Sequence, residues 1–80
     1  MKSASRHTAE SKLQLGQTIA DARRHCGFTQ KDLSAKTGIS QSDISRLEQS
    51  TANPSIRTLE RIADGLGMKL HIEFIVPEDE

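Results

Sequence analysis

Residues 29–49 read TQKDLSAKTGISQSDISRLEQ and contain two helix starts of the same form, eleven residues apart. Thr29 and Asp32 make up the first, and Ser40 and Asp43 make up the second. A capping hydroxyl followed three residues later by an acidic side chain stabilises a helix N-terminus, through hydrogen bonds and through the helix dipole. The stretch therefore predicts two short helices in succession.

A glycine separates these two predicted helices. Gly38 lies where the first helix must stop and the chain must turn sharply, a position that suits the left-handed backbone conformation of glycine. Leu33, Ile39, Ile44 and Leu47 are spaced so that they can meet as one buried seam. We therefore expect a helix, a tight turn and a second helix.

The second helix also has a polar face. Hydrogen-bonding side chains and one cation recur there at the spacing of a single helix stripe: Ser42, Ser45, Arg46 and Gln49. Such side chains suit base edges in a major groove. An ordinary solvated helix face would look the same in isolation, so the interpretation depends on the motif around it.

Residues 11 to about 67 resemble the helix-turn-helix domain of the Xre/lambda-repressor-like (Cro/C1-type) family. The resemblance rests on residues in the family's order and spacing: Gln30, Leu33, Ser34, Gly38, Ile39, Ile44, Leu47 and Glu48. It implies an all-α, lambda-repressor-like bundle of about four to five short helices that binds double-stranded DNA. It also implies that Arg23 pairs with Glu48 and clamps the first helix to the end of the recognition helix.

The resemblance also implies the DNA contacts. Base-reading side chains are expected at Gln41, Ser42 and Arg46, and the polar stripe adds Ser45 and Gln49. Arg46 suits the O6 and N7 atoms of guanine, and Gln41 suits adenine. Phosphate contacts are expected from Gln30, which would also brace Gln41, and from Thr51 and Asn53 in the following loop. Lys31 and Lys36 are reasonable phosphate neighbours by their charge, and the alternative is that they are merely exposed. The family usually has glycine where this chain has Ser50, so we expect the recognition helix to end differently.

Flanking helices complete the predicted bundle. Leu15, Ile19, Ala22 and Cys26 form the inward stripe of a first helix from about Ser11 to His25. A last helix is expected to begin with Asn53 as N-cap and Pro54 as its first residue, and to end at Gly67.

The residues after this last helix change period. Leu70, Ile72, Phe74 and Val76 alternate with mostly polar residues in 68–76, as in a β-strand. A lone strand leaves backbone groups unpaired, so it needs a partner. We expect the same strand of a second copy, paired antiparallel in a homodimer. A flap packed over the last helix is the alternative.

The predicted organisation is a flexible arm (1–10), the helix-turn-helix domain (11–67), the dimerisation strand (68–76) and an acidic tail (77–80).

Composition limits the classes of function. The net charge of zero conceals an asymmetry, because residues 1–46 hold eight Lys/Arg and four Asp/Glu, whereas residues 47–80 hold three and seven. The basic half contains the recognition helix, as a polyanionic partner requires. The single cysteine and the absence of a long apolar run or signal pattern suggest a soluble, cytoplasmic protein.

Catalytic or cofactor-dependent functions find no support. The chain has no nucleophile elbow or phosphate-binding glycine loop, and its His and Cys spacing matches no zinc pattern, so we expect no enzyme, cofactor or metal.

The helices with a C-terminal strand resemble HipB/HigA-type antitoxins, which implies a bacterial or phage-derived autoregulator with a palindromic operator and possibly a toxin partner. The alternatives are a phage-type repressor, a restriction-modification controller, and a protein-interaction adapter resembling multiprotein bridging factors.

Overall fold

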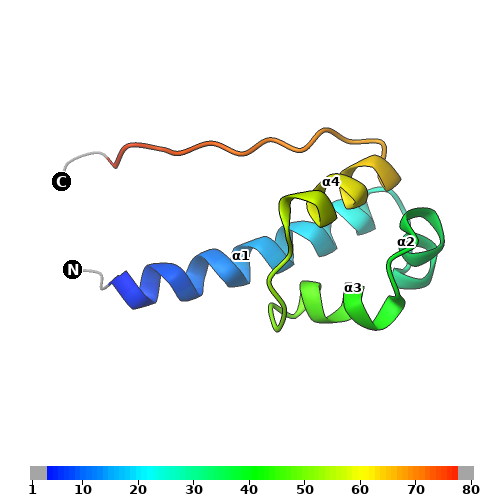
Figure 1. Ribbon diagram of the computed structural model, residues 1–80, viewed down its shortest axis with the longest axis horizontal. Coiled ribbons are helices and arrows are strands. Elements are labelled where there is room, and N and C mark those ends of the chain that lie inside the picture. The colour runs from blue at the N-terminus through cyan, green and yellow to red at the C-terminus, as the bar shows by residue number, and fades with distance from the viewer. Residues whose placement is uncertain (1–3, 78–80) are drawn as a thin grey trace.

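A computed structural model describes residues 4–77, with the backbone alone described for 4–13. Its helices are α1 (Ala4–His25), α2 (Gln30–Thr37), α3 (Gln41–Glu48) and α4 (Ile56–Gly65). Figure 1 shows α2, α3 and α4 gathered around the C-terminal half of the long α1. The predicted all-α helix-turn-helix bundle is confirmed. Residues 1–3 and 78–80, the ends of the predicted arm and acidic tail, lie outside the described residues.

The helix-turn-helix forms from the local signals in the sequence. Thr29 Oγ1 accepts the backbone N–H of Asp32 at 3.0 Å, and Asp32 Oδ2 accepts that of Thr29 at 2.9 Å, which completes a capping box. Gly38 has φ 77° and donates its N–H to Ser34 O at 2.9 Å, so it ends α2 as predicted. Ser40 Oγ accepts the N–H of Asp43 at 3.1 Å and caps α3.

One hydrophobic core joins the four helices. It consists of Ile19, Leu33, Ile39, Ile44, Leu47, Ile62 and Leu66. The side chains of Leu33 and Ile44 are fully buried, so the facing sides of α2 and α3 are fixed against each other. α3 packs against both α1 and α2, and α4 packs against α2. This packing fixes one side of α3 and leaves the other side to solvent.

Two glycines allow helices to approach closely. A Cβ atom at Gly16 in α1 would lie 2.5 Å from the carbonyl oxygen of Glu48 and 2.8 Å from that of Leu47. A Cβ atom at Gly65 in α4 would lie 2.6 Å from Thr37 Cγ2. Gly65 lowers helix propensity, but it makes room for the end of α2.

Two helices begin at residues other than those predicted. α1 begins at Ala4 instead of about Ser11, so most of the predicted arm is helical. Residues 4–10 contain neither Gly nor Pro, so nothing in their sequence breaks a helix, and this part of α1 projects beyond the bundle (Figure 1). The N-cap of α4 is Ser55 rather than Asn53, because the Ser55 hydroxyl accepts the N–H of Thr58 at 3.1 Å.

The end of α3 keeps the geometry that glycine would give. Ser50 adopts a left-handed conformation with φ 63°. The N–H of Thr51 donates to Arg46 O at 2.9 Å, and that of Ser50 donates to Leu47 O at 3.2 Å, as in a Schellman motif. The expectation of a different helix end was therefore wrong, because Ser50 adopts the left-handed conformation that glycine would give and the same backbone hydrogen bonds close α3.

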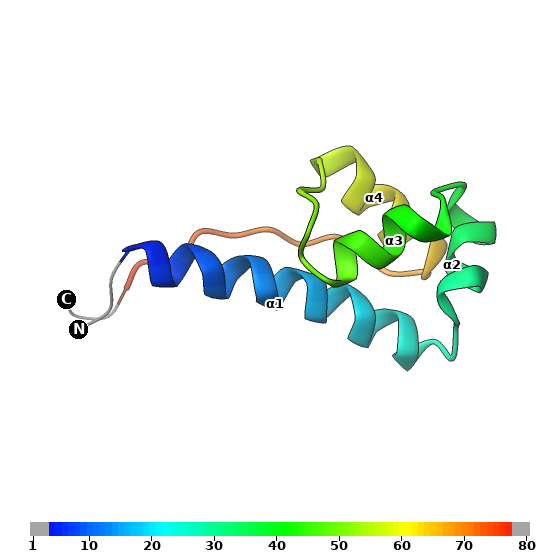
Figure 2. The same cartoon turned by 90° about the horizontal axis from the view of Figure 1, so that it is seen from below.

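The chain after α4 is extended and largely exposed. Met68 packs against the core, but Ile72, Phe74 and Val76 are 55%, 100% and 86% exposed. Figures 1 and 2 show this segment running back toward the N-terminal end of α1. Residues 68–77 form no strand within the described chain. Such exposure does not fit a packed flap, and the strand stays a prediction because its pairing requires a second chain.

Candidate nucleic-acid interface

α3 presents the predicted base-reading residues on its solvent side. Ile44 and Leu47 point into the core, whereas Gln41, Ser42, Arg46 and Gln49 are exposed. Ser45 is half-buried at the edge of this face. The structure thus gathers the five residues on one accessible surface, which we call the α3 face. A helix exposed in this way can enter a major groove.

The C-terminal end of α3 is fixed by a nearly buried ion pair. Arg23 Nε donates to Glu48 Oε2 at 2.7 Å, and Arg23 Nη2 donates to Glu48 Oε1 at 3.0 Å. Arg23 Nη1 also donates to the carbonyl of Phe28 at 2.8 Å. The two side chains are 9% and 6% exposed. The bidentate geometry orients α3 relative to α1, as the resemblance implied.

Gln30 joins this pair instead of bracing Gln41. Its Nε2 donates to Glu48 Oε1 at 3.0 Å, so the carboxylate is bound from both α1 and α2. Burial raises the pKa of Glu48, but the hydrogen bonds from Arg23 and Gln30 outweigh burial and hold that pKa below its usual value. The bracing of Gln41 is not observed because the carboxylate is the stronger acceptor for the amide.

Side chains on the α3 face bond to one another. Gln49 Nε2 donates to Ser45 Oγ at 3.1 Å, one helical turn away. The guanidinium of Arg46 pairs with the carboxylate of Asp43, also one turn away. This pairing, together with the Ser40 hydroxyl, holds the pKa of Asp43 below its usual value. Neighbouring side chains one turn apart are therefore connected along α3.

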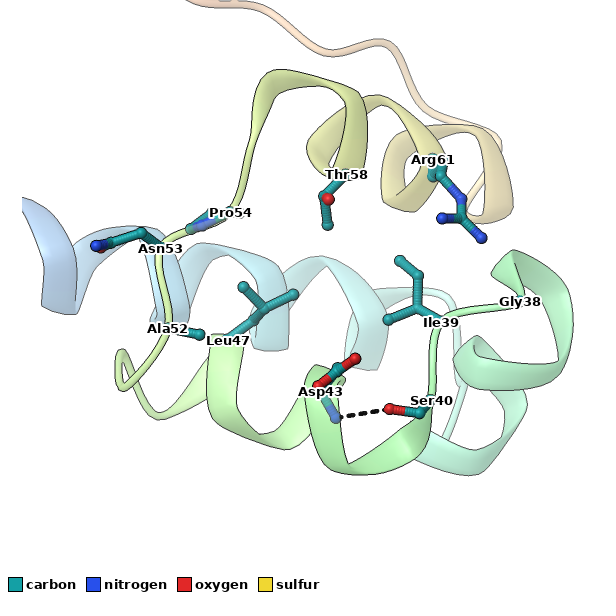
Figure 3. Close-up of a pocket in the computed structure, with 10 residues that line it drawn as sticks. All are labelled: Gly38, Ile39, Ser40, Asp43, Leu47, Ala52, Asn53, Pro54, Thr58 and Arg61. Atoms are coloured by element: carbon teal, nitrogen blue, oxygen red, sulfur yellow. Dashed lines mark hydrogen bonds between the residues drawn. The ribbon is translucent and has the colours of Figure 1, made fainter.

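The residues predicted to contact phosphate lie on α2 and in the loop after α3. Lys31 and Lys36 are exposed on α2, and Lys36 Nζ lies 5.1 Å from the centre of the Phe28 ring. Thr51 Oγ1 donates to Arg46 O at 3.2 Å and so helps to close α3. Asn53 is exposed beside Pro54 at the end of a groove between α3 and α4 (Figure 3).

Arg61 lines this groove and makes a contact that the sequence did not predict. Figure 3 shows Arg61 of α4 reaching toward Gly38, above the start of α3. Arg61 Nη2 donates to Thr37 O at 2.8 Å, at the C-terminal end of α2. The bond ties α4 to the turn of the helix-turn-helix. No short-range sequence signal connects residues 24 positions apart, so the contact appears only in the folded chain.

The comparison with known families decides the class of this interface. A model of the helix-turn-helix family matches residues 19–72, which include α2, the turn and α3. The chain belongs to the Xre/lambda-repressor-like helix-turn-helix family. It is a DNA-binding transcriptional regulator, a class distinct from enzymes.

Curated relatives in this helix-turn-helix family resemble the chain over most of its length. An uncharacterized HTH-type transcriptional regulator, y4dJ of Sinorhizobium fredii, is 39% identical over 66 residues, 82% of this chain and 84% of the relative. Antitoxin HigA1 of Mycobacterium tuberculosis is 29% identical over 86% of this chain and 46% of its own length. The regulator SinR of Bacillus subtilis is 33% identical over 71% of this chain and 52% of its own length. No solved structure matches the chain.

Two further properties accompany this helix-turn-helix domain. Among the described residues, no helix combines the length and apolar character that crossing a membrane requires. No three His, Cys, Asp or Glu side chains in that part of the chain are arranged to bind a metal ion. Cys26 is half-buried, and its Sγ lies 3.6 Å from Leu66 O.

Proposed function

We propose that this chain is an antitoxin-like autorepressor that binds a palindromic operator as a homodimer in the cytoplasm. The observation that carries the proposal is the α3 face, which holds five polar side chains on a helix whose other side is fixed in the core. Arg46 and Gln41 are suited to guanine and adenine edges. The surrounding phosphate contacts would come from Lys31, Lys36, Gln30, Thr51 and Asn53.

The exposed segment after α4 supports the homodimer. Leu70, Ile72, Phe74 and Val76 would form the apolar face of a strand paired with the same strand of a second copy. Two related α3 helices could then enter major grooves about 34–36 Å apart, one turn of DNA. Similarity to a relative named Antitoxin HigA1 supports a toxin as a further partner.

The test is a gel-shift titration on the DNA upstream of the gene, with random DNA as competitor and salt varied. We expect palindrome-dependent binding, roughly a thousandfold tighter than non-specific binding. Arg46→Ala should weaken operator binding about tenfold or more. Arg57→Ala removes an exposed positive charge of α4, outside the proposed DNA and dimer contacts, and serves as the control.

Other outcomes would identify the alternatives. Equal, weak binding to operator and random DNA would contradict the repressor proposal and favour a protein-interaction adapter. Operator binding that survives Arg46→Ala would contradict base reading by α3. The neighbouring reading frames separate the specific repressors, because a toxin-like gene favours an antitoxin and a methyltransferase favours a restriction-modification controller.

A further inference from the structure

The two capping sequences of the helix-turn-helix use their acidic side chains differently. In α2, the Asp32 carboxylate returns to the N–H of Thr29 and completes the capping box. In α3, Ser40 accepts the N–H of Asp43, but the Asp43 carboxylate pairs forward with the guanidinium of Arg46. The hydrogen bond that caps α3 comes from the backbone N–H of residue 43, so the Asp43 carboxylate lies between the Ser40 hydroxyl and Arg46 and can interact with both.

The position of this pair suggests its use. Asp43 and Arg46 are 49% and 60% exposed, and Arg46 lies on the α3 face. The bond to Asp43 uses one of the five N–H donors of the guanidinium. Enough donors remain for the two acceptors of a guanine edge, O6 and N7.

We propose that Asp43 is a positioning residue that holds Arg46 for guanine and thereby determines specificity at that base. The proposal rests on the proposed DNA reading by α3. A free arginine side chain has many rotamers and loses that freedom on binding. A guanidinium already held by a carboxylate is pre-organised, so less freedom is lost when it meets the guanine.

The negative charge of Asp43 should also increase the specificity of Arg46 for guanine. A lone guanidinium is attracted to any phosphate, which adds affinity without sequence information. The Asp43–Arg46 pair has no net charge, so its attraction to the DNA backbone is weak. A guanine edge can still use the remaining donors with their fixed directions. Asp43 should therefore lower non-specific affinity and sharpen the preference for guanine.

The experiment selects binding sites from a library of randomised duplexes with the full-length protein. Wild type is compared with Asp43→Asn, whose side-chain oxygen still accepts a hydrogen bond, and with Asp43→Ala, which cannot bind Arg46. Asp32→Asn is the matched control, because it removes the same charge at the same position of the neighbouring helix. Affinity for one random duplex is measured across salt concentrations, and melting temperatures monitor folding.

We expect the guanine preference at one position of each half-site to fall about tenfold in Asp43→Ala and less in Asp43→Asn. Affinity of Asp43→Ala for the random duplex should rise, and its log–log salt dependence should steepen by about 0.9 if Arg46 gains a phosphate. Asp32→Asn should keep the guanine preference of wild type.

Three results would overturn the inference. Equal gains in affinity for all duplexes, with an unchanged guanine preference, would show that Asp43 only repels phosphate. Parallel losses of affinity and melting temperature in the Asp43 and Asp32 variants would show a capping function alone. Absence of any base preference in wild type would refute the proposed function itself, and with it the positioning of Arg46, before any variant is compared.

Discussion

At the scale of single residues, the carboxylate of Glu48 connects three helices. It lies at the end of α3 and accepts hydrogen bonds from Arg23 of α1 and Gln30 of α2. A nearly buried charge without its partner is costly, because neither water nor a counter-ion replaces the lost interaction. The orientation of α3 therefore depends on this one cluster.

Arg23→Ala should lower the free energy of unfolding by about 3 kcal/mol, because it leaves the Glu48 carboxylate unpaired. Arg24→Ala is the control, since Arg24 pairs with Asp21 at 3.8 Å and both side chains are more than 60% exposed. Exposed pairs contribute less than about 1 kcal/mol. Urea denaturation measures both variants, and equal losses would contradict a special contribution from the Glu48 cluster.

Stability should also depend on pH through Glu48. Its pKa in the folded protein lies below the ordinary value of 4.5, so the unfolded state takes up a proton first as the pH falls. The contribution is present above pH 4.5 and is lost as the pH falls through the lower, folded pKa. Urea denaturation from about pH 5 to pH 3 should show a shallower decline for Glu48→Gln than for wild type. Parallel declines in the two proteins would show that Glu48 does not contribute to the pH dependence of stability.

At the scale of elements, the contact between α1 and α3 depends on an absent side chain. The backbone carbonyls of Leu47 and Glu48 occupy the space that a Cβ atom at position 16 would need. These carbonyls belong to the last turn of α3, where Arg23 already holds Glu48. A small residue and a buried ion pair thus fix the same helix end.

Gly16→Ala should destabilise the protein by about 1–3 kcal/mol, although alanine is the better helix former. The loss arises because backbone atoms of α3 must move to admit the methyl group. For a domain of this size, the melting temperature should fall by roughly 4–8 °C for each kcal/mol. Gln14→Ala, at an exposed position of α1, should change it little. An increase for Gly16→Ala would refute the close approach.

At the scale of the whole molecule, polar and apolar surfaces are separated. The α3 face and the exposed lysines of α2 are suited to DNA, whereas the segment after α4 exposes a row of large apolar side chains. Residues of that kind at solvent-exposed positions typically mark an interaction surface. The proposed DNA binding and the proposed self-association would therefore use different parts of the chain.

Phe74→Glu should convert the proposed dimer into a folded monomer, because it places a charge on the apolar face of the paired strands. Ile75→Glu is the matched control, since Ile75 is 76% exposed and alternates with Phe74 onto the other face. Sedimentation and circular dichroism report the mass and the helix content of each variant. If Phe74→Glu is still a dimer, the strand is not part of the dimer interface.

The sequence by itself determined the helix-turn-helix and its buried side. Thr29, Asp32 and Ser40 act within a few residues, Gly38 acts on its own backbone, and Ile44 and Leu47 follow a helical period. Local hydrogen bonds and periodicity need no knowledge of distant residues. The α3 face could be predicted for the same reason, because it is the side opposite the apolar stripe.

Only the tertiary structure decided how these elements are held together. The bond from Arg61 to Thr37, the Gln30 bond to Glu48 and the close approach at Gly16 all join residues at least 18 positions apart. The structure also shows the left-handed conformation of Ser50, at a position where local preference favours glycine. Contacts between distant residues depend on how the whole chain packs, so no local pattern records them.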